Sequence, residues 1–445
     1  MALVAGCSPA PKRPDAPAAG LNLVIVTLDT TRADYVTCLG GPEGVTPQID
    51  SLAQKGTLFE NAYSVANVTK PTHLSILTGQ RLSEHGVFGN GIRIPSDLAT
   101  LPKALTELGY DTASFVSMLD LGSAPDWPGI HDIDAPEITR TADEVLKEAL
   151  SWLDQRGPDK DPFFLWVHMY DPHTPYDPPP IKAAQFYRGN PRRPDHPLLL
   201  DHPFLKNKEH PGLRASLEGI RDPEYPRAMY AAEVRHADQQ VGRLVSQLDR
   251  RGLLPTTVFV VVADHGESLD EHDILYAHLG LYEVSLRIPM LIVAPGFPAG
   301  VRVSERVTQL DLAETLAALF GVELQGTAGR SLLACLRGEP MPSLDERELV
   351  FEASNGLQVA VRRDRWKLIW PLRPNPSLPS EPELFDLEAD PGETRDVAAE
   401  HPDVFAELAL LIEPWIEQGK VVPNDLETLP DSVLEELKNL GYTGD

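Results

Sequence analysis

The sequence predicts an α/β protein in which a mixed β-sheet is sandwiched by helices and a small C-terminal domain contains an antiparallel sheet. Three observations lead to this prediction. Short apolar runs rich in Val and Ile alternate with segments of helical periodicity, the pattern of a sheet covered on both faces. From about residue 349 the chain changes to short alternating segments, typical of an antiparallel sheet. A length of 445 residues leaves room for a large domain and such an appendage.

The predicted elements follow one another in a strand–helix order until that change. Predicted strands, each a short apolar run, lie at residues 22–28, 110–116, 162–168, 256–263 and 288–294. Predicted helices lie at residues 46–55, 98–108, 142–153, 229–250 and 309–320. The C-terminal part has predicted strands at 349–353, 357–363, 366–370 and 384–387 and a helix at 402–418. The Pro-rich residues 177–226 are expected to be irregular, as a lid or rim.

These patterns divide the chain into an N-terminal tether (1–20), a large domain (21–342) and a C-terminal subdomain of antiparallel sheet and helices (343–445). The tether contains Leu3-Val4-Ala5-Gly6-Cys7, which looks like the cleavage box of bacterial lipoproteins, and then a Pro/Ala linker. Most of a signal sequence is missing, so either the true start lies upstream or the box is a chance match. We expect a lipoprotein of the bacterial cell envelope or periplasm, and a cytoplasmic protein if the start is genuine and Cys7 is unmodified.

Composition limits the partners of the protein. A net charge of −27, from 39 basic and 66 acidic residues, repels nucleic acid. Three cysteines cannot build a disulfide framework, and no apolar run is as long as a membrane span, so membrane contact is expected only through an N-terminal lipid. A small anionic substrate is compatible with this negative net charge, because a bound metal ion can set the sign of the charge around it. The oligomeric state is not predictable from these features.

The stretch from Val68 to His73 is the first candidate site element. Thr69 is expected to cap a helix that has Pro71 in its first turn. The first N–H groups of that helix would then point at whatever Thr69 touches, and a helix N-terminus favours a phosphate- or sulfate-like anion. An ordinary capped helix is the alternative.

Two further polar sites come directly after predicted strands. Asp29 follows the first strand, where open α/β sheets place ligands. Asp264 and His265 follow the most apolar strand, 256–263. A polar pair at such a place is costly without a partner, so metal ligation is one interpretation and a capping or turn aspartate is the other.

In this order the motifs resemble the sulfatase family, which belongs to the alkaline phosphatase superfamily. The likeness spans roughly residues 21–400. It rests on Asp29, Thr69-x-Pro71-Thr72-His73-(x)5-Gly79, Pro172-His173-Thr174-Pro175, Asp264-His265-Gly266-Glu267, His278-(x)3-Tyr282-Glu283-(x)3-Arg287-Ile288-Pro289, and a closing segment that includes Trp366-Lys367-Leu368 and Leu384-Phe385-Asp386. The resemblance implies a sulfatase-like fold and a hydrolase of sulfate or phosphate esters.

The chain departs from the family pattern at the position of the nucleophile. The family has a cysteine or serine there and oxidises it to formylglycine, whereas this chain has Thr69, so no formylglycine is expected. Other family residues are replaced as well: the arginine of that motif by His73, a second aspartate by Thr30, a lysine by His278, and a sulfate-gripping Lys-x-His pair by residues near Ser117 and Leu119. Threonine nucleophiles are familiar among phosphodiesterases and phosphoryl transferases of the superfamily.

We assign one divalent metal ion to Asp29, Thr69, Asp264 and His265. Two carboxylates suit Ca²⁺, which the resemblance also implies, and the imidazole of His265 favours the alternatives Mn²⁺ and Zn²⁺. The ion would activate the hydroxyl of Thr69 as the nucleophile.

Three histidines, His73, His173 and His278, are predicted catalytic residues that donate to the ester oxygens or protonate the leaving group. The alternative for each is a loop histidine satisfied by local polar groups. His272 and His168 are expected to be structural.

Three functions are consistent with these residues. The first is a metal-dependent, sulfatase-like hydrolase whose substrate is a small anionic ester or a sulfated or phosphorylated glycan or lipid. The second is a phosphoryl-type transferase or phosphodiesterase of the envelope. The third is a non-catalytic lipoprotein that binds anionic glycans, which the retained carboxylates disfavour because idle buried charges cost stability. We expect phosphate-type esters to react faster than sulfates.

Overall fold

The computed structural model describes residues 18–118, 121, 130–131, 139–156, 161–206 and 211–418. The predicted lipobox, most of the tether, Leu119 and the chain beyond residue 418 lie outside these residues, so envelope localisation stays a prediction. Within the described part, none of the helices is both long enough and apolar enough to cross a lipid bilayer.

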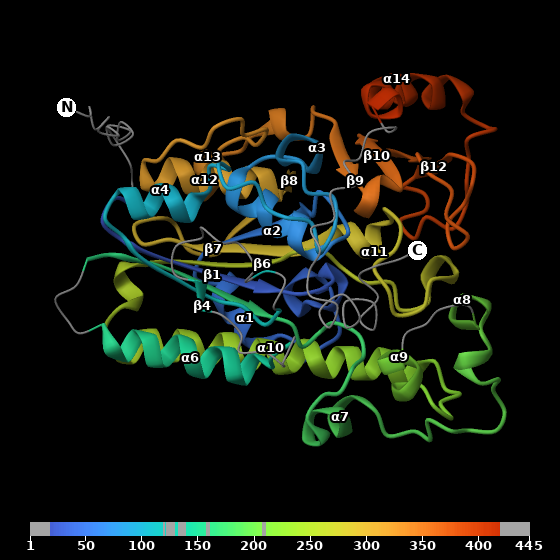
Figure 1. The fold of residues 1–445 in the computed structure, drawn as a ribbon, viewed down its shortest axis with the longest axis horizontal. Helices are drawn as coiled ribbons and strands as arrows, with labels where there is room; N and C mark the ends of the chain where they lie inside the picture. Colours follow the sequence, from blue (N-terminus) through green and yellow to red (C-terminus); the bar gives the residue numbers. More distant parts are fainter. Residues whose placement is uncertain are drawn as a thin grey trace, which may run out of the picture.

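An eight-stranded sheet forms the centre of the molecule, in the order β4-β3-β5-β1-β6-β7-β2-β8 (Figure 1). Its strands are β1 (Asn22–Leu28), β2 (Thr57–Tyr63), β3 (Asp111–Phe115), β4 (Ile130–His131), β5 (Phe163–Met169), β6 (Thr257–Ala263), β7 (Arg287–Val293) and β8 (Val301–Thr308). β1 is parallel to β5 and β6, whereas β7 is antiparallel to β6 and β2. The predicted mixed sheet is therefore confirmed. The strands β1, β5 and β6 are buried along their whole length, as their continuous apolar runs require.

Helices cover both faces of this sheet, as predicted (Figure 1). The helices α1 (Pro47–Ala53), α6 (Ala142–Gln155) and α10 (Glu224–Arg250) share one apolar core with the sheet. On the opposite face, α2 (Thr69–Thr78), α4 (Leu101–Glu107) and α12 (Gln309–Phe320) share the other. Short helices complete this part: α3 (Leu82–His85), α7 (Pro180–Phe186), α8 (Pro203–Lys206), α9 (Pro211–Ser216), α11 (Glu283–Leu286) and α13 (Leu333–Leu336).

Some elements differ from the prediction. β2 and β8 have no clear sequence signal, because β2 carries polar residues at a register shift and β8 is an edge strand that alternates apolar with charged residues. The Pro-rich residues 177–226 are not wholly irregular, because they contain α7, α8 and α9, each of which begins at a proline that presets its first turn. The same stretch also holds the start of α10, five residues earlier than Met229, its predicted beginning.

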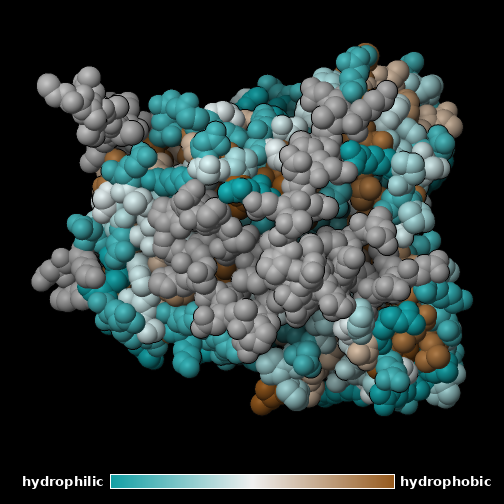
Figure 2. Space-filling view, viewed as in Figure 1, coloured by the Kyte–Doolittle hydropathy of each residue, from teal (hydrophilic) through white to brown (hydrophobic). Residues whose placement is uncertain are grey.

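A separate four-stranded antiparallel sheet confirms the predicted C-terminal appendage. Its strands are β9 (Leu349–Glu352), β10 (Gln358–Arg363), β11 (Trp366–Pro371) and β12 (Glu383–Asp386), and α14 (Pro402–Gln418) covers one of its faces. Alternation along β10 explains the two cores: Val359 and Val361 pack toward α14, whereas Ala360 packs toward the large domain. The boundaries that we predict for the domains are not tested by this arrangement. The face in Figure 2 shows mostly hydrophilic side chains outside its grey area.

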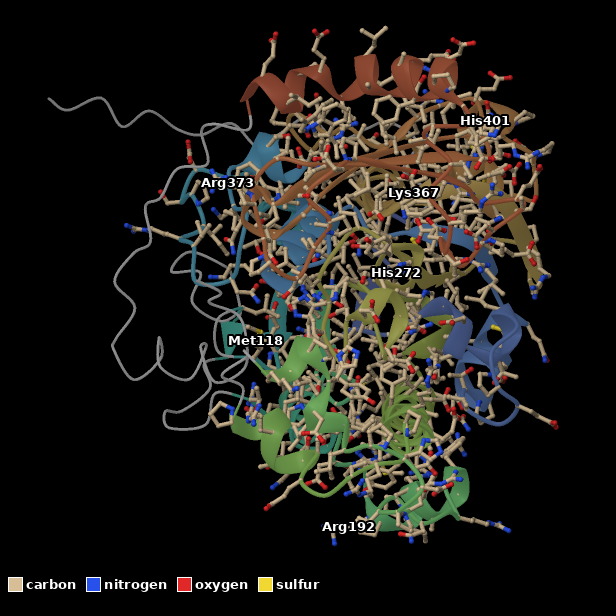
Figure 3. The ribbon with its side chains drawn as sticks, turned by 90° about the vertical axis from the view of Figure 1, so that its right-hand side faces the viewer. Met118, Arg192, His272, Lys367, Arg373 and His401 are labelled. Carbon is tan, nitrogen blue, oxygen red and sulfur yellow. The ribbon has the colours of Figure 1, made fainter. Side chains whose placement is uncertain are left out.

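A buried ionic network joins the two sheets around Lys367, which Figure 3 labels together with His272. The Lys367 side chain is fully buried, and its Nζ lies 3.1 Å from Glu283 Oε1 and 2.8 Å from Glu393 Oε1. Arg362 contacts the other oxygen of Glu283 at 3.2 Å. The network connects α11 of the large domain with β10 and β11 of the small sheet.

Replacing Lys367 by methionine should lower the free energy of unfolding by about 3–5 kcal/mol, because the buried Glu393 loses its cationic partner and Glu283 keeps only Arg362. Denaturant titration measures the change. Lys147 is exposed on α6 and serves as the matched control, for which Lys147→Met should change stability by no more than about 0.5 kcal/mol. Equal losses at the two positions would contradict the stabilising role of the network.

Candidate active site

Two carboxylates meet at the C-terminal ends of neighbouring parallel strands. The register pairs Leu28 of β1 with Ala263 of β6, which places Asp29 and Asp264 side by side just beyond the sheet. Both side chains are completely buried. The sequence prediction placed them at one sheet edge, and the parallel pairing of β1 with β6 is the reason they lie there.

Thr69 reaches the same place from α2. Its Oγ1 lies 3.3 Å from Nε2 of His265, and this nitrogen lies 3.5 Å from Oδ2 of Asp264. Thr69 is fully buried. The structure thus brings together Asp29, Thr69, Asp264 and His265, the four residues predicted to bind a metal ion.

The predicted capping role of Thr69 is wrong. Val68 holds the N-cap position with an extended backbone (φ −150°, ψ 136°), and Thr69 is the first helical residue. The hydroxyl of Thr69 is therefore directed to His265 and does not cap the helix. Of the first N–H groups, that of Lys70 donates to Asn90 Oδ1 at 2.9 Å, so this group is already used within the protein.

Asp264 is held by backbone groups on one side. Its Oδ1 accepts hydrogen bonds from the N–H groups of Thr30 (3.0 Å) and His265 (2.7 Å). Thr30 has a φ of +46°, which is costly for a β-branched residue, and Tyr230 supports it by donating to its carbonyl at 2.7 Å. This leaves Oδ2 of Asp264 to face the cluster.

Several buried oxygen and nitrogen atoms of the cluster have no hydrogen-bond partner among the described residues. They are Asp29 Oδ1, Asp264 Oδ2, Thr30 Oγ1 and His73 Nε2. Buried polar atoms are normally satisfied, so such a group points to an absent ion or water. Donor atoms of Asp29, Asp264 and His265 all lie within 4.8 Å of one another, which fits one small divalent cation.

Burial also makes the cluster electrostatically unfavourable without a cation. It raises the pKa of Asp264 to about 6. It raises the pKa of Asp29 well above its ordinary value, and the neighbouring charges of Asp264 and Glu267 add to this shift. Burial lowers the pKa of His265 to about 4, so its imidazole is neutral and can act as a ligand.

Backbone carbonyls fix the tautomers of three imidazoles. Nδ1 of His73 lies 2.7 Å from the Thr69 carbonyl, Nδ1 of His265 lies 2.9 Å from that of Gly266, and Nδ1 of His278 lies 2.7 Å from that of Asn67. A carbonyl only accepts, so each Nδ1 carries the hydrogen. In the neutral ring Nε2 is then a lone-pair nitrogen that can accept a proton or bind a metal.

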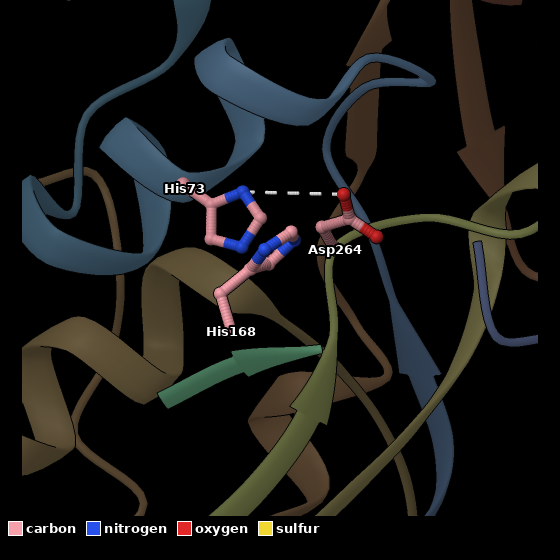
Figure 4. Close-up of side chains that lie close together, drawn as sticks. All are labelled: His73, His168 and Asp264. Carbon is pink, nitrogen blue, oxygen red and sulfur yellow. Dashed lines mark ion pairs between the residues drawn. The ribbon is translucent and has the colours of Figure 1, made fainter. Parts of the chain in front are cut away.

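The predicted catalytic histidines occupy two different places. The ring of His278 lies 4.6 Å from that of His265, and the ring of His173 lies 5.6 Å from that of His278. His278 is half-buried, whereas His73 belongs to α2 and is buried. Figure 4 shows the side chains of His73, His168 and Asp264 close together, with His73 Nδ1 3.9 Å from Asp264 Oδ2. His272 lies apart from this group and stacks on Tyr282, as the structural role predicts.

Sequence reasoning missed two residues of the site. His168 is buried, as expected, but its Nε2 also lies 3.2 Å from Asp29 Oδ2. The parallel pairing of Thr27 with His168 is the signal that could have found it, and this pairing is not visible along the chain. Asn67 donates to the carbonyl of His278 at 2.8 Å and accepts from the Ser354 N–H at 3.0 Å, which ties the site to the small sheet.

Comparison with known proteins gives matches to sulfatases. A family model described as "Sulfatase" matches residues 21–322, and one described as "N-sulphoglucosamine sulphohydrolase, C-terminal" matches residues 271–414. The choline-sulfatase of Rhizobium meliloti is 27% identical over 438 residues, covering 85% of this chain and 82% of that protein.

Solved structures share the fold. One, in complex with D-glucosamine-2-N,6-O-disulfate, has a TM-score of 0.73 at 22% identity and covers 92% of this chain and 100% of its own. The phosphonate monoester hydrolase of Agrobacterium radiobacter has a TM-score of 0.70 at 21% identity and covers 90% of this chain and 96% of its own.

Proposed function

Because the chain belongs to the sulfatase family of the alkaline phosphatase superfamily, we propose that it is a metal-dependent hydrolase of sulfate or phosphate esters with Thr69 as its nucleophile. One observation carries this proposal. The Thr69 hydroxyl lies 3.3 Å from His265 Nε2, beside two buried carboxylates that each have an oxygen without a partner among the described residues.

Asp29, Asp264, His265 and the Thr69 hydroxyl would hold the cation. A bound divalent ion lowers the pKa of a hydroxyl ligand and neutralises the charge of the ester oxygens. The carboxylates and the family resemblance favour Ca²⁺, and the imidazole of His265 favours Mn²⁺ or Zn²⁺.

The position of Thr69 prepares it for in-line attack. As the first residue of α2 it is fixed by the helix, and the Nδ1–H of His73 donates to its carbonyl. Attack by Oγ1 on phosphorus would form a threonine ester and release the alcohol of the substrate. Water would then attack the same phosphorus, release phosphate and restore the hydroxyl, so the two steps give hydrolysis.

We assign proton transfer to His278 and His173, whose rings lie 5.6 Å apart. The Nδ1–H of His278 donates a hydrogen bond to the Asn67 carbonyl. Nε2 is therefore the ring nitrogen that can exchange a proton. A protonated imidazole here would give its proton to the leaving oxygen, and the neutral ring would accept one from water.

Threonine in the nucleophile position supports a preference for phosphate-type esters. Without formylglycine, a sulfate ester on Thr69 has no second hydroxyl to eliminate it and would break down slowly. The relatives support both substrate classes, since one is named as a choline-sulfatase and one structure as a phosphonate monoester hydrolase. We therefore infer a small anionic ester or a sulfated or phosphorylated glycan as substrate.

A metal-dependent activity panel tests the proposal. Chelator-treated protein should lose at least about 10²-fold of its ester turnover, because a bound ion supplies several kcal/mol of charge stabilisation. Ca²⁺, Mn²⁺ and Zn²⁺ are then added singly with an aryl sulfate, a phosphate monoester, a phosphate diester and a phosphonate monoester. Full turnover without metal would contradict the proposal. An added alcohol that captures the phosphoryl group in place of water would identify a transferase.

A further inference from the structure

We propose that His168 is a positioning residue that holds Asp29 in the orientation required for cation binding. This inference rests on the proposed metal site. In this inference His168 acts on the cation through the carboxylate of Asp29 and is not itself a ligand.

The direction of two hydrogen bonds carries the argument. The backbone N–H of Ser117 lies 3.3 Å from Nδ1 of His168, and an N–H group can only donate. Nδ1 is therefore the lone-pair nitrogen, and the hydrogen of the neutral ring is on Nε2. Nε2 lies 3.2 Å from Oδ2 of Asp29, to which it donates.

This tautomer is opposite to that of His73, His265 and His278, whose Nδ1 atoms donate to carbonyls. In those three rings Nε2 carries no hydrogen, whereas in His168 it does. A ring that presents a hydrogen cannot ligate a metal ion through that nitrogen but can orient a ligand. The chemistry of His168 is therefore that of a hydrogen-bond donor to Asp29.

The hydrogen bond from His168 gives the two oxygens of Asp29 different roles. Oδ2 is engaged by His168, whereas Oδ1 is buried without a partner among the described residues. Asp264 shows the same division, with one oxygen held by backbone N–H groups and the other facing the cluster. Both carboxylates are thus fixed by donors on one side, and each offers one oxygen to a cation.

Ser117 anchors His168 at two points. Its N–H donates to the ring, and its hydroxyl donates to the His168 carbonyl at 2.5 Å. The sequence resemblance places the first residue of the family's sulfate-binding Lys-x-His pair near Ser117. In this chain the segment therefore supports a metal ligand.

The experiment compares cation affinity in three variants. His168→Leu keeps the apolar volume but removes the donor, and His168→Gln restores an N–H near the position of Nε2. His85→Leu is the matched control, because His85 is also buried and also accepts a backbone N–H at Nδ1, from Val87 at 3.1 Å. Its other nitrogen lies 3.4 Å from the hydroxyl of Ser75.

Affinity for Mn²⁺ is measured by chelator competition on folded protein, independently of turnover. His168→Leu should bind about 10–100-fold more weakly than wild type, the usual effect of losing a partner of a metal ligand. His168→Gln should recover most of this loss, and His85→Leu should bind like wild type. Nitrogen chemical shifts of labelled histidine should show the hydrogen of His168 on Nε2.

Wild-type affinity in His168→Leu, failure of glutamine to restore binding, or a hydrogen on Nδ1 would each overturn the inference while leaving the hydrolase proposal intact. Wild-type protein that binds no divalent ion would overturn both the metal site and the inference. Normal cation binding without any ester turnover would overturn the proposed function alone.

Discussion

Replacing Thr69 by valine should lower ester turnover by at least about 10³-fold, because loss of a nucleophile leaves only the binding and electrostatic parts of catalysis. Valine keeps the branched shape of threonine in a site where this side chain is fully buried, so the packing of α2 should change little. Initial rates with the best ester of the panel measure the effect. Mass spectrometry of wild type quenched during turnover should find phosphate on Thr69.

Thr69→Ser is the matched control for this prediction. Serine keeps the hydroxyl and should retain turnover within about tenfold of wild type, since the group that attacks is unchanged. Near wild-type rates in Thr69→Val would show that Thr69 is not the nucleophile. A higher rate with aryl sulfate than with every phosphate-type ester would instead contradict the substrate preference.

Replacing Asp264 by asparagine should remove most of the bound divalent ion and lower turnover by at least about 10²-fold, because a ligand charge is lost. Oδ1 of Asp264 accepts two backbone N–H groups, so an asparagine oxygen can take its place there. The amide nitrogen would then face the cluster and repel a cation. Elemental analysis of purified protein measures the metal content, and kinetics measure the turnover.

Asp238→Asn is the matched control for the loss of a buried carboxylate. Asp238 is a fully buried residue of α10 whose carboxylate accepts backbone N–H groups of Gln48 and Ile49 in the first turn of α1, and it does not belong to the cluster of Asp29, Asp264 and His265. Its replacement should leave the metal content unchanged. Equal metal content in Asp264→Asn and wild type would remove Asp264 from the site.

Local residue patterns are enough to identify the strands that carry the site and the residues at their ends. Continuous apolar runs identify β1, β5 and β6, because a strand buried on both faces needs apolar side chains in both directions. Asp29 and Asp264 come directly after two of these runs, so their place at the sheet edge follows from the local pattern. The prediction that Thr69 is the nucleophile likewise comes from the motif alone.

The way in which these residues meet depends on the fold as a whole. The contact between His168 and Asp29 depends on the parallel register of β5 with β1, which links positions 139 residues apart in the chain. The tautomers depend on which backbone groups lie beside each ring, and the hydrogen bond from Ser354 to Asn67 joins residues 287 positions apart. Strand pairing and side-chain packing over such separations are set by the whole core, so a local pattern of residues does not contain them.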